Sequence, residues 1–241
     1  MAKLTKHQQK LVDFKTKNPG PFAPEEAIKL LKENKAVKFD ETVELHFRLG
    51  INPKLSDQQI RSTVNLPGGT GKDVRVAVVA KGEKLTEAQE AGADVYGAED
   101  LVAKIGEGFM DFDKLVSTPD AMAMLSKMGK ILGPRGLMPN PKDGTVTFDI
   151  AKTVKELKAG KVSFRAEKDG GLVQMAIGKL SFKDGKLMKN LTAVYETVQK
   201  VKPTSVKGTY IKSVYLSSTM GPGLKLDLSK LQDLTKSAAV G

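Results

Sequence analysis

The spacing of hydrophobic side chains divides the chain into stretches of two kinds. In residues 42–50, TVELHFRLG, apolar and polar side chains alternate, which is typical of a strand with two unlike faces. One face would carry the apolar side chains of Val43, Leu45, Phe47 and Leu49. The other face would carry the polar side chains of Thr42, Glu44, His46 and Arg48.

A central stretch instead alternates between strands and helices. Residues 74–80, VRVAVVA, are almost continuously apolar, as a strand buried on both faces requires. The next segments read as a helix (83–92), a short strand (93–97) and a helix (98–108), and 112–118 then leads to a helix at 120–130. Repeated strand–helix units predict a parallel sheet with helices on both faces, which is a Rossmann-like three-layer α/β arrangement.

The segments on either side of this stretch predict a different architecture. Residues 24–34 indicate a helix that begins at Pro24, and residues 186–202 indicate one that ends before Pro203. Residues 161–178 predict two strands joined by a turn at Asp169-Gly170, and residues 210–223 predict a strand that closes the ordered part. The chain therefore predicts a discontinuous α+β outer domain with an antiparallel sheet, into which a second domain is inserted.

Glycines mark the two places where the chain would cross between these domains. Gly68, Gly69 and Gly71 precede the α/β stretch, and Gly160 follows it. Because glycine tolerates unusual backbone dihedrals, these residues would act as hinges that let the inserted domain swing. We expect the outer domain to comprise residues 1–67 and 161–241, and the inserted domain to comprise residues 68–160.

Charge is distributed unevenly between these parts. The chain has 39 Lys and Arg residues against 28 Asp and Glu residues, which gives a net charge of +11. Residues 68–160 have a net charge of −1, so the rest of the chain has +12. Such an excess of cations favours a polyanion such as nucleic acid as the partner, although a solvated basic face would give the same count.

The sequence lacks the residues for several kinds of chemical site. Cysteine is absent and the only histidines are His7 and His46, so a zinc site is not expected. Residues 66–73, LPGGTGKD, resemble the end of a phosphate-binding P-loop, but Leu66 and Asp73 stand where that motif needs Gly and Ser or Thr. The first α/β strand is followed by KGEK, and not by the glycine fingerprint of dinucleotide sites. We expect no catalytic residue, no metal and no cofactor.

The first residues, MAKLTKHQQKLVDF, are cationic and amphipathic but lack the apolar core of a secretory signal. No later stretch is long and apolar enough to span a bilayer. We expect a soluble, cytoplasmic protein with no membrane partner.

Three polar stretches of the outer segments combine the side chains that RNA recognition uses. In residues 35–44, Lys38 offers a phosphate contact, Phe39 a stacking surface, and Thr42 and Glu44 groups for 2′-hydroxyls or base edges. Taken alone, this stretch favours a core position for Phe39 at a helix–strand corner. The other two stretches favour instead a single RNA surface to which all three stretches, including Phe39, contribute.

The second stretch, 161–168, places polar side chains on one face of a strand: Lys161, Ser163, Arg165 and Glu167. The third, 212–223, does the same with Ser213, Ser217 and Thr219 before the turn Met220-Gly221-Pro222-Gly223. Glycines in that turn would let the backbone approach a ligand closely. Because only 5% of the residues are aromatic, a surface for folded RNA is favoured over stacking along a single strand.

Several long motifs together resemble the bacterial large-subunit ribosomal protein L-one family. They are GKILGPRGLMPNPKDGTV (129–146), KFDETVELHFRLG, RSTVNLPGGTGKDVRVAVVAKGEK and KSVYLSSTMGPG. The resemblance covers nearly the whole chain, and it is weakest after about Asp227, where the tail is expected to be mobile. It implies the same two-domain arrangement.

The resemblance also implies the partners. These are the large ribosomal subunit and its rRNA at the mobile stalk, the exit-site tRNA, and the mRNA of the protein's own operon, which it would repress. The protein would be ribosome-bound in the cytoplasm and monomeric when free. The RNA surface carried over from the matching motifs consists of Lys38, Phe39, Thr42, Glu44, Arg165, Lys168, Ser213, Thr219, Met220 and Gly221.

Two other hypotheses stay open at this point. One is a structured-RNA-binding protein outside the ribosome, and the other is a nucleotide-dependent α/β enzyme. The loop GPRGLMPNP (133–141) lies in the near-neutral inserted domain, where its prolines fix φ and its glycines relax it. We interpret it as a rigid shaped loop and not as a phosphate-binding loop.

Overall fold

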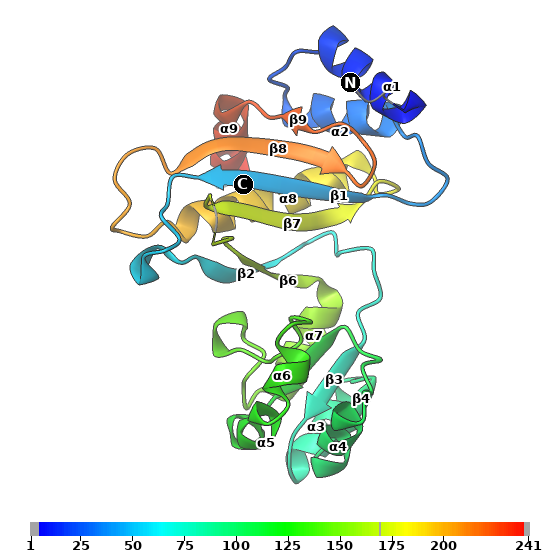
Figure 1. The fold of residues 1–241 in the computed structure, drawn as a ribbon, viewed down its shortest axis with the longest axis vertical. Helices are drawn as coiled ribbons and strands as arrows, with labels where there is room; N and C mark the ends of the chain where they lie inside the picture. Colours follow the sequence, from blue (N-terminus) through cyan, green and yellow to red (C-terminus); the bar gives the residue numbers. More distant parts are fainter. Residues whose placement is uncertain (1–4, 169, 239–241) are drawn as a thin grey trace. The chain divides into compact units, whose positions relative to one another are not determined.

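The computed structural model describes residues 5–168 and 170–238, which form two compact units (Figure 1). The first unit comprises 1–60, 66–71 and 164–241, and the second comprises 61–65 and 72–163. The bounds differ from the predicted ones because 61–65 and 161–163 belong to the second unit and 68–71 to the first. Assignment of the units to an outer and an inserted domain stays a prediction. Asp169 of the predicted turn and the first four residues lie outside the described part.

The first unit is built on an antiparallel sheet, as the alternating pattern predicts. The strand β1 (Thr42–Leu49) lies between β7 (Leu172–Lys179) and β8 (Ile211–Ser218), and β9 (Leu224–Lys225) pairs with β8. Every second residue of β1 is buried, and Leu45 lies opposite Met175 on β7 and Leu216 on β8.

Helices cover the apolar face of this sheet. The helix α2 (Pro24–Glu33) contacts β8, α8 (Asp184–Lys200) contacts β7, and α9 (Leu228–Ala238) packs against α8. The rings of Phe47 and Tyr195 meet between β1 and α8 with their centroids 6.5 Å apart. Apart from these, α1 (Lys6–Lys17) begins at a capping box in which Thr5 and Gln8 bond each other's backbone.

The second unit contains a three-stranded parallel sheet, also as predicted. The strand β3 (Val76–Val79) lies between β4 (Val95–Gly97) and β5 (Lys114–Ser117). Side chains of β3 point alternately to two apolar clusters. Val76 and Val78 pack with α3 (Glu83–Glu90) and α7 (Ile150–Ala159). Ala77 and Val79 pack with α4 (Glu99–Gly106), α5 (Met122–Ser126) and α6 (Gly129–Leu132).

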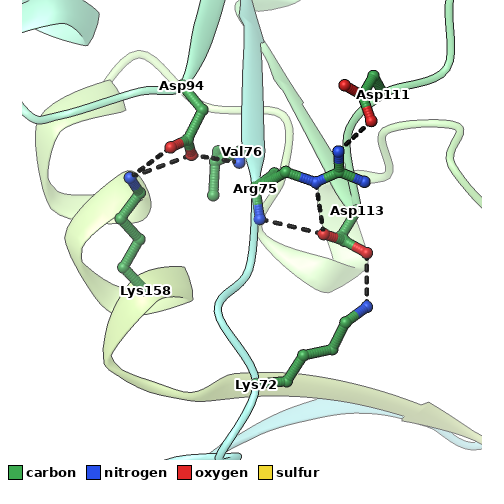
Figure 2. Close-up of polar contacts among 7 residues, drawn as sticks. All are labelled: Lys72, Arg75, Val76, Asp94, Asp111, Asp113 and Lys158. Carbon is green, nitrogen blue, oxygen red and sulfur yellow. Dashed lines mark hydrogen bonds and ion pairs between the residues drawn. The ribbon is translucent and has the colours of Figure 1, made fainter.

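Two carboxylates bind the start of β3 (Figure 2). Asp94, just before β4, accepts hydrogen bonds from the Val76 N–H at 2.8 Å and from Lys158. Asp113, just before β5, accepts hydrogen bonds from Lys72 Nζ at 2.6 Å and from the Arg75 N–H at 3.1 Å. These charged contacts lie at the amino ends of the strands.

Both carboxylates have lowered pKa values. Hydrogen bonding to Lys72 is the largest cause for Asp113, and the Arg75 N–H adds to it. For Asp94, burial acts to raise the pKa, but hydrogen bonds from the Val76 N–H and Lys158 together outweigh it. Both groups are therefore held in their charged form.

Several predicted elements differ from the observed ones. The expected helix at 120–130 is divided into the 3-10 turn η2 (Pro119–Ala121), α5 and α6, because the chain bends at Met128-Gly129 so that Leu125 and Leu132 are both buried. The strand β6 (Lys161–Arg165) pairs with β2 (Arg61–Asn65) in a two-stranded sheet. The residues just after it contact β7 through a bridge between Ala166 and Val173 and a bond from the Glu167 N–H to Leu172 O.

Residues 228–238 form the helix α9, which was not predicted from the sequence, while mobility of the tail stays a prediction. The remaining short turns are η1 (Ser56–Gln58) and η3 (Pro141–Asp143). Among the residues described, no helix is long and apolar enough to cross a membrane.

Candidate RNA interface

The face of the four-stranded sheet opposite its helices carries a continuous row of polar side chains. Glu44 lies opposite Ser217, His46 opposite Tyr215, and Arg48 opposite Ser213. His46 Nε2 and Ser217 Oγ are 2.8 Å apart and share a hydrogen bond. We call this row the polar strip, and it consists of Thr42, Glu44, His46, Arg48, Ser213, Tyr215 and Ser217.

At one end of the strip, Glu41 fixes the turn that follows β8. Its side chain is only 1% exposed. Its Oε2 accepts hydrogen bonds from Ser218 Oγ at 2.7 Å and from the Met220 N–H at 2.9 Å. Its Oε1 is buried with no hydrogen-bond partner among the described residues. Because burying a carboxylate is costly unless it is hydrogen-bonded, the Ser218 and Met220 bonds hold this turn firmly.

Thr42 and Thr219 join β1 to the same turn. The Thr219 N–H donates to Thr42 O at 3.1 Å, and the Thr42 N–H donates to Thr219 Oγ1 at 3.0 Å. Lys179 Nζ donates to Thr42 Oγ1 at 3.0 Å. Replacing Thr219 would therefore disturb the turn as well as any RNA contact that its hydroxyl makes.

Phe39 is exposed just before this end of β1. Its ring is 52% accessible, so the core position that its own stretch favoured is wrong. The next residue, Asp40, accepts hydrogen bonds from Ser181 Oγ at 2.7 Å and from the Ser181 N–H at 3.1 Å. The hydroxyl bond is the largest cause of the lowered pKa of Asp40, and it anchors the segment while Phe39 stays accessible.

The predicted RNA residues do not all lie at one place. Thr42, Thr219, Met220 and Gly221 meet at the end held by Glu41, and Lys38 and Phe39 precede it. Ser213 lies opposite Arg48, toward the other end of β1, where Lys168 is also found. Arg165 ends β6 and lies outside the four-stranded sheet.

The predicted RNA residues leave out Tyr215 and Glu41, and also Arg48 and His46, although the alternation had already placed these last two on the polar face of the strand. Tyr215 has the same strand parity as Ser213 and Ser217 and is 39% exposed, so the alternation alone would have placed it on the polar strip. Arg48 has the same signal within β1. Glu41 carries no comparable signal, because nothing in a single sequence tells that a carboxylate will be buried beneath a distant turn.

Two backbone donors of the loop that resembles a P-loop are occupied. The Gly68 N–H donates to Asn190 Oδ1 at 2.7 Å, and the Gly69 N–H donates to Leu66 O. Lys72 binds Asp113. Within the described part of the chain, no group of three or more His, Cys, Asp or Glu residues could hold a metal ion.

Comparison with known proteins gives a consistent result. Residues 30–222 match the model of the ribosomal protein L1p/L10e family. The large ribosomal subunit protein uL1 of Prochlorococcus marinus (strain MIT 9313) is 55% identical over 217 residues, which cover 90% of this chain and 92% of the relative. The uL1 protein of Synechococcus sp. (strain WH7803) is 55% identical over 89% of this chain and 91% of its own. That of Prochlorococcus marinus (strain MIT 9211) is 49% identical over 97% of this chain and 100% of its own.

Proposed function

Because the chain belongs to the ribosomal protein L1p/L10e family, we propose that it binds large-subunit rRNA through the polar strip and the turn held by Glu41. Proteins of this family are structural components of the ribosome, so the chain is a ribosomal protein and not an enzyme. The observation that carries the proposal is the partly exposed polar face of β1 and β8, held on a hydrogen-bonded sheet, which suits recognition of folded RNA by shape.

The proposal extends to the cellular role. The chain would sit on the ribosome in the cytoplasm as part of the mobile stalk of the large subunit, and it would aid release of deacylated exit-site tRNA. It would also repress translation of its own operon mRNA through the same surface, and it would be monomeric when free. Support for these roles comes from family membership and from the single RNA surface that they would share.

The two compact units would have different functions. The outer domain would hold RNA, because the polar strip and the turn after β8 belong to the first unit. Gly71 and Gly160 both have positive φ, at +71° and +114°, and would allow the inserted domain to move. Gly68 and Gly69 bond Asn190, so we propose that any hinge motion begins after them.

Phe39→Leu tests the RNA surface. A leucine stays apolar but cannot stack on a base, and loss of stacking costs ~1–3 kcal/mol. We expect titration against the stalk fragment of large-subunit rRNA to show this loss. Phe148→Leu is the matched control, because Phe148 is 55% exposed in the second unit.

The same titration tests the function itself. The unaltered chain should prefer the stalk fragment over a scrambled hairpin of equal length at physiological salt. If both RNAs bind alike and both bindings fall together as salt rises, the chain is a non-specific polyanion binder and the ribosomal proposal is wrong. If Phe39→Leu and Phe148→Leu behave alike while the preference holds, Phe39 does not belong to the site.

A further inference from the structure

A hollow lies at the Arg48 end of the polar strip, opposite the end held by Glu41. It has a volume of about 360 Å³ and is lined by the end of β1, residues 51–54, Lys168, Gly170 and the start of β8. Four of its lining residues are cations: Arg48, Lys54, Lys168 and Lys212. We call it the cationic hollow.

Two glycines allow the backbone segments of the hollow to come together. The Gly50 N–H donates to Tyr210 O at 2.6 Å, and a Cβ on Gly50 would lie 2.4 Å from Thr209 O. The Leu49 N–H donates to Gly171 O at 3.0 Å. A Cβ on Gly171, where φ is +63°, would lie 2.9 Å from the Ile51 side chain. The hollow is thus a fixed feature of the backbone, because side chains at these positions would force its walls apart.

The described residues that line the hollow carry only positive charge. None of them is an Asp or Glu, and none of its four cations forms an ion pair with another described residue. All four are exposed. Some cations elsewhere in the chain do form ion pairs, as Lys161 does with Glu156 at 2.8 Å. Four like charges around one concave surface repel each other, and that repulsion is relieved when an anion enters.

We propose that the cationic hollow binds backbone phosphates of the same RNA that occupies the turn held by Glu41. This inference rests on the proposed function and extends its RNA footprint to Arg48, Lys54 and Lys212. The two ends of the polar strip are roughly 20 Å apart, since Thr42 and Arg48 are six residues apart on a strand. His46 and Tyr215 lie between them on the same face, so one folded RNA can span the strip.

The chemistry of the hollow favours backbone phosphates over bases. Its cations are exposed side chains for which no described residue serves as a hydrogen-bond partner, and such side chains suit contacts with phosphate oxygens better than precise contacts with base edges. The hollow would therefore fix the position of the RNA, while the turn at Thr219-Met220 would read its shape.

The test is the double variant Lys54→Gln/Lys212→Gln in the full chain, titrated against the stalk rRNA fragment across a salt series. Each lost phosphate contact should reduce the slope of log K against log salt by roughly 0.7–0.9, and the pair should weaken binding roughly tenfold at physiological salt. The control is Lys29→Gln/Lys189→Gln, which removes the same charge from α2 and α8, on the helical face of the sheet. The control should leave the slope nearly unchanged.

Phosphate-ethylation interference adds a readout that misfolding would not produce. We expect a set of phosphates whose ethylation weakens the unaltered chain but no longer matters for Lys54→Gln/Lys212→Gln. Equal slopes for this variant and the control, with no phosphate lost from the interference pattern, would overturn the proposal. If the unaltered chain also fails to prefer the stalk fragment over the scrambled hairpin, the proposed function has failed as well. A retained preference with an unchanged slope refutes the hollow alone.

Discussion

At the scale of single residues, the turn of the proposed RNA surface depends on the lack of a side chain at Gly221. A Cβ at this position would lie 2.3 Å from Ser218 Oγ, which is the hydroxyl that donates to buried Glu41. Gly221→Ala should therefore displace the Ser218 hydroxyl and leave Glu41 with one hydrogen bond fewer. We expect it to cost ~1–2 kcal/mol of stability and to weaken binding of the stalk rRNA fragment. Thermal unfolding and an RNA titration would measure both effects.

Gly223 provides the matched control for this substitution. It lies in the same turn, but a Cβ there would meet no atom within 4 Å. Gly223→Ala should leave the stability and the RNA affinity nearly unchanged. Equal effects of the two substitutions would mean that the turn does not depend on the bond between Ser218 and Glu41.

Single residues could be predicted from the sequence where strand alternation determines their environment. That pattern placed Thr42 and Glu44 on the polar face of β1. It could not place Phe39, which lies outside any regular element and is exposed although aromatic. Contacts such as that between Glu41 and Met220 join residues 179 positions apart, and no local pattern contains them.

At the scale of elements, Asp113 ties the start of β3 to the residues before it. Asp113→Asn keeps the shape but removes the charge that binds Lys72 and Arg75. We expect a loss of ~1–2 kcal/mol in the free energy of local opening of β3 at neutral pH, since bonds to charged groups are stronger than neutral ones. Hydrogen exchange of the Val76–Val79 amides would measure it.

The pH dependence of this effect follows from the pKa of Asp113. That pKa is lowered in the folded protein from an ordinary value of 3.8, so the carboxylate stabilises the fold fully above that value. The stabilisation is lost as the pH falls through the lowered pKa, so the difference between Asp113→Asn and the unaltered chain should vanish in strong acid. Asp111→Asn is the control and should have a smaller effect, because Asp111 is 71% exposed and binds Arg75 alone. A difference that persists at low pH would contradict the electrostatic explanation.

Elements were predictable where periodicity was long or continuous, and less so elsewhere. The apolar run of β3 predicted a strand buried on both faces, and both apolar clusters confirm it. The helix α9 has Leu228, Leu231 and Leu234 at helical spacing after Asp227, which accepts the Ser229 N–H. This helical spacing can be read from the sequence. The helix was not predicted because the tail resembles the family least and was expected to be mobile. The strand β2 reads RSTVN, which is too short and polar for a periodicity argument.

At the scale of the whole molecule, the first unit supplies the side chain that holds Gly68 and Gly69, where the chain leaves this unit for the second one. Asn190 is fully buried on α8 and makes three hydrogen bonds to the backbone. It accepts from the Gly68 N–H and donates to Gly69 O at 3.0 Å and to Ile177 O at 2.7 Å. Charge distribution could predict that the chain has two parts, but it could not place their boundary, because residues 68–71 belong to the first unit through this side chain.

A chain that joins 1–71 directly to 161–241 tests whether the first unit carries the RNA specificity alone. It keeps the polar strip, the cationic hollow and all backbone partners of Asn190, so we expect it to prefer the stalk fragment nearly as well as the full chain. A shorter version that joins 1–67 to 161–241 removes Gly68 and Gly69 and leaves the buried amide of Asn190 with Ile177 alone. It should be less stable by ~1–3 kcal/mol, because a buried polar group without partners retains its full desolvation cost. Urea unfolding and the RNA titration measure the two properties separately. If the longer version folds but no longer distinguishes the two RNAs, the second unit supplies part of the specificity and the surface proposed here is incomplete.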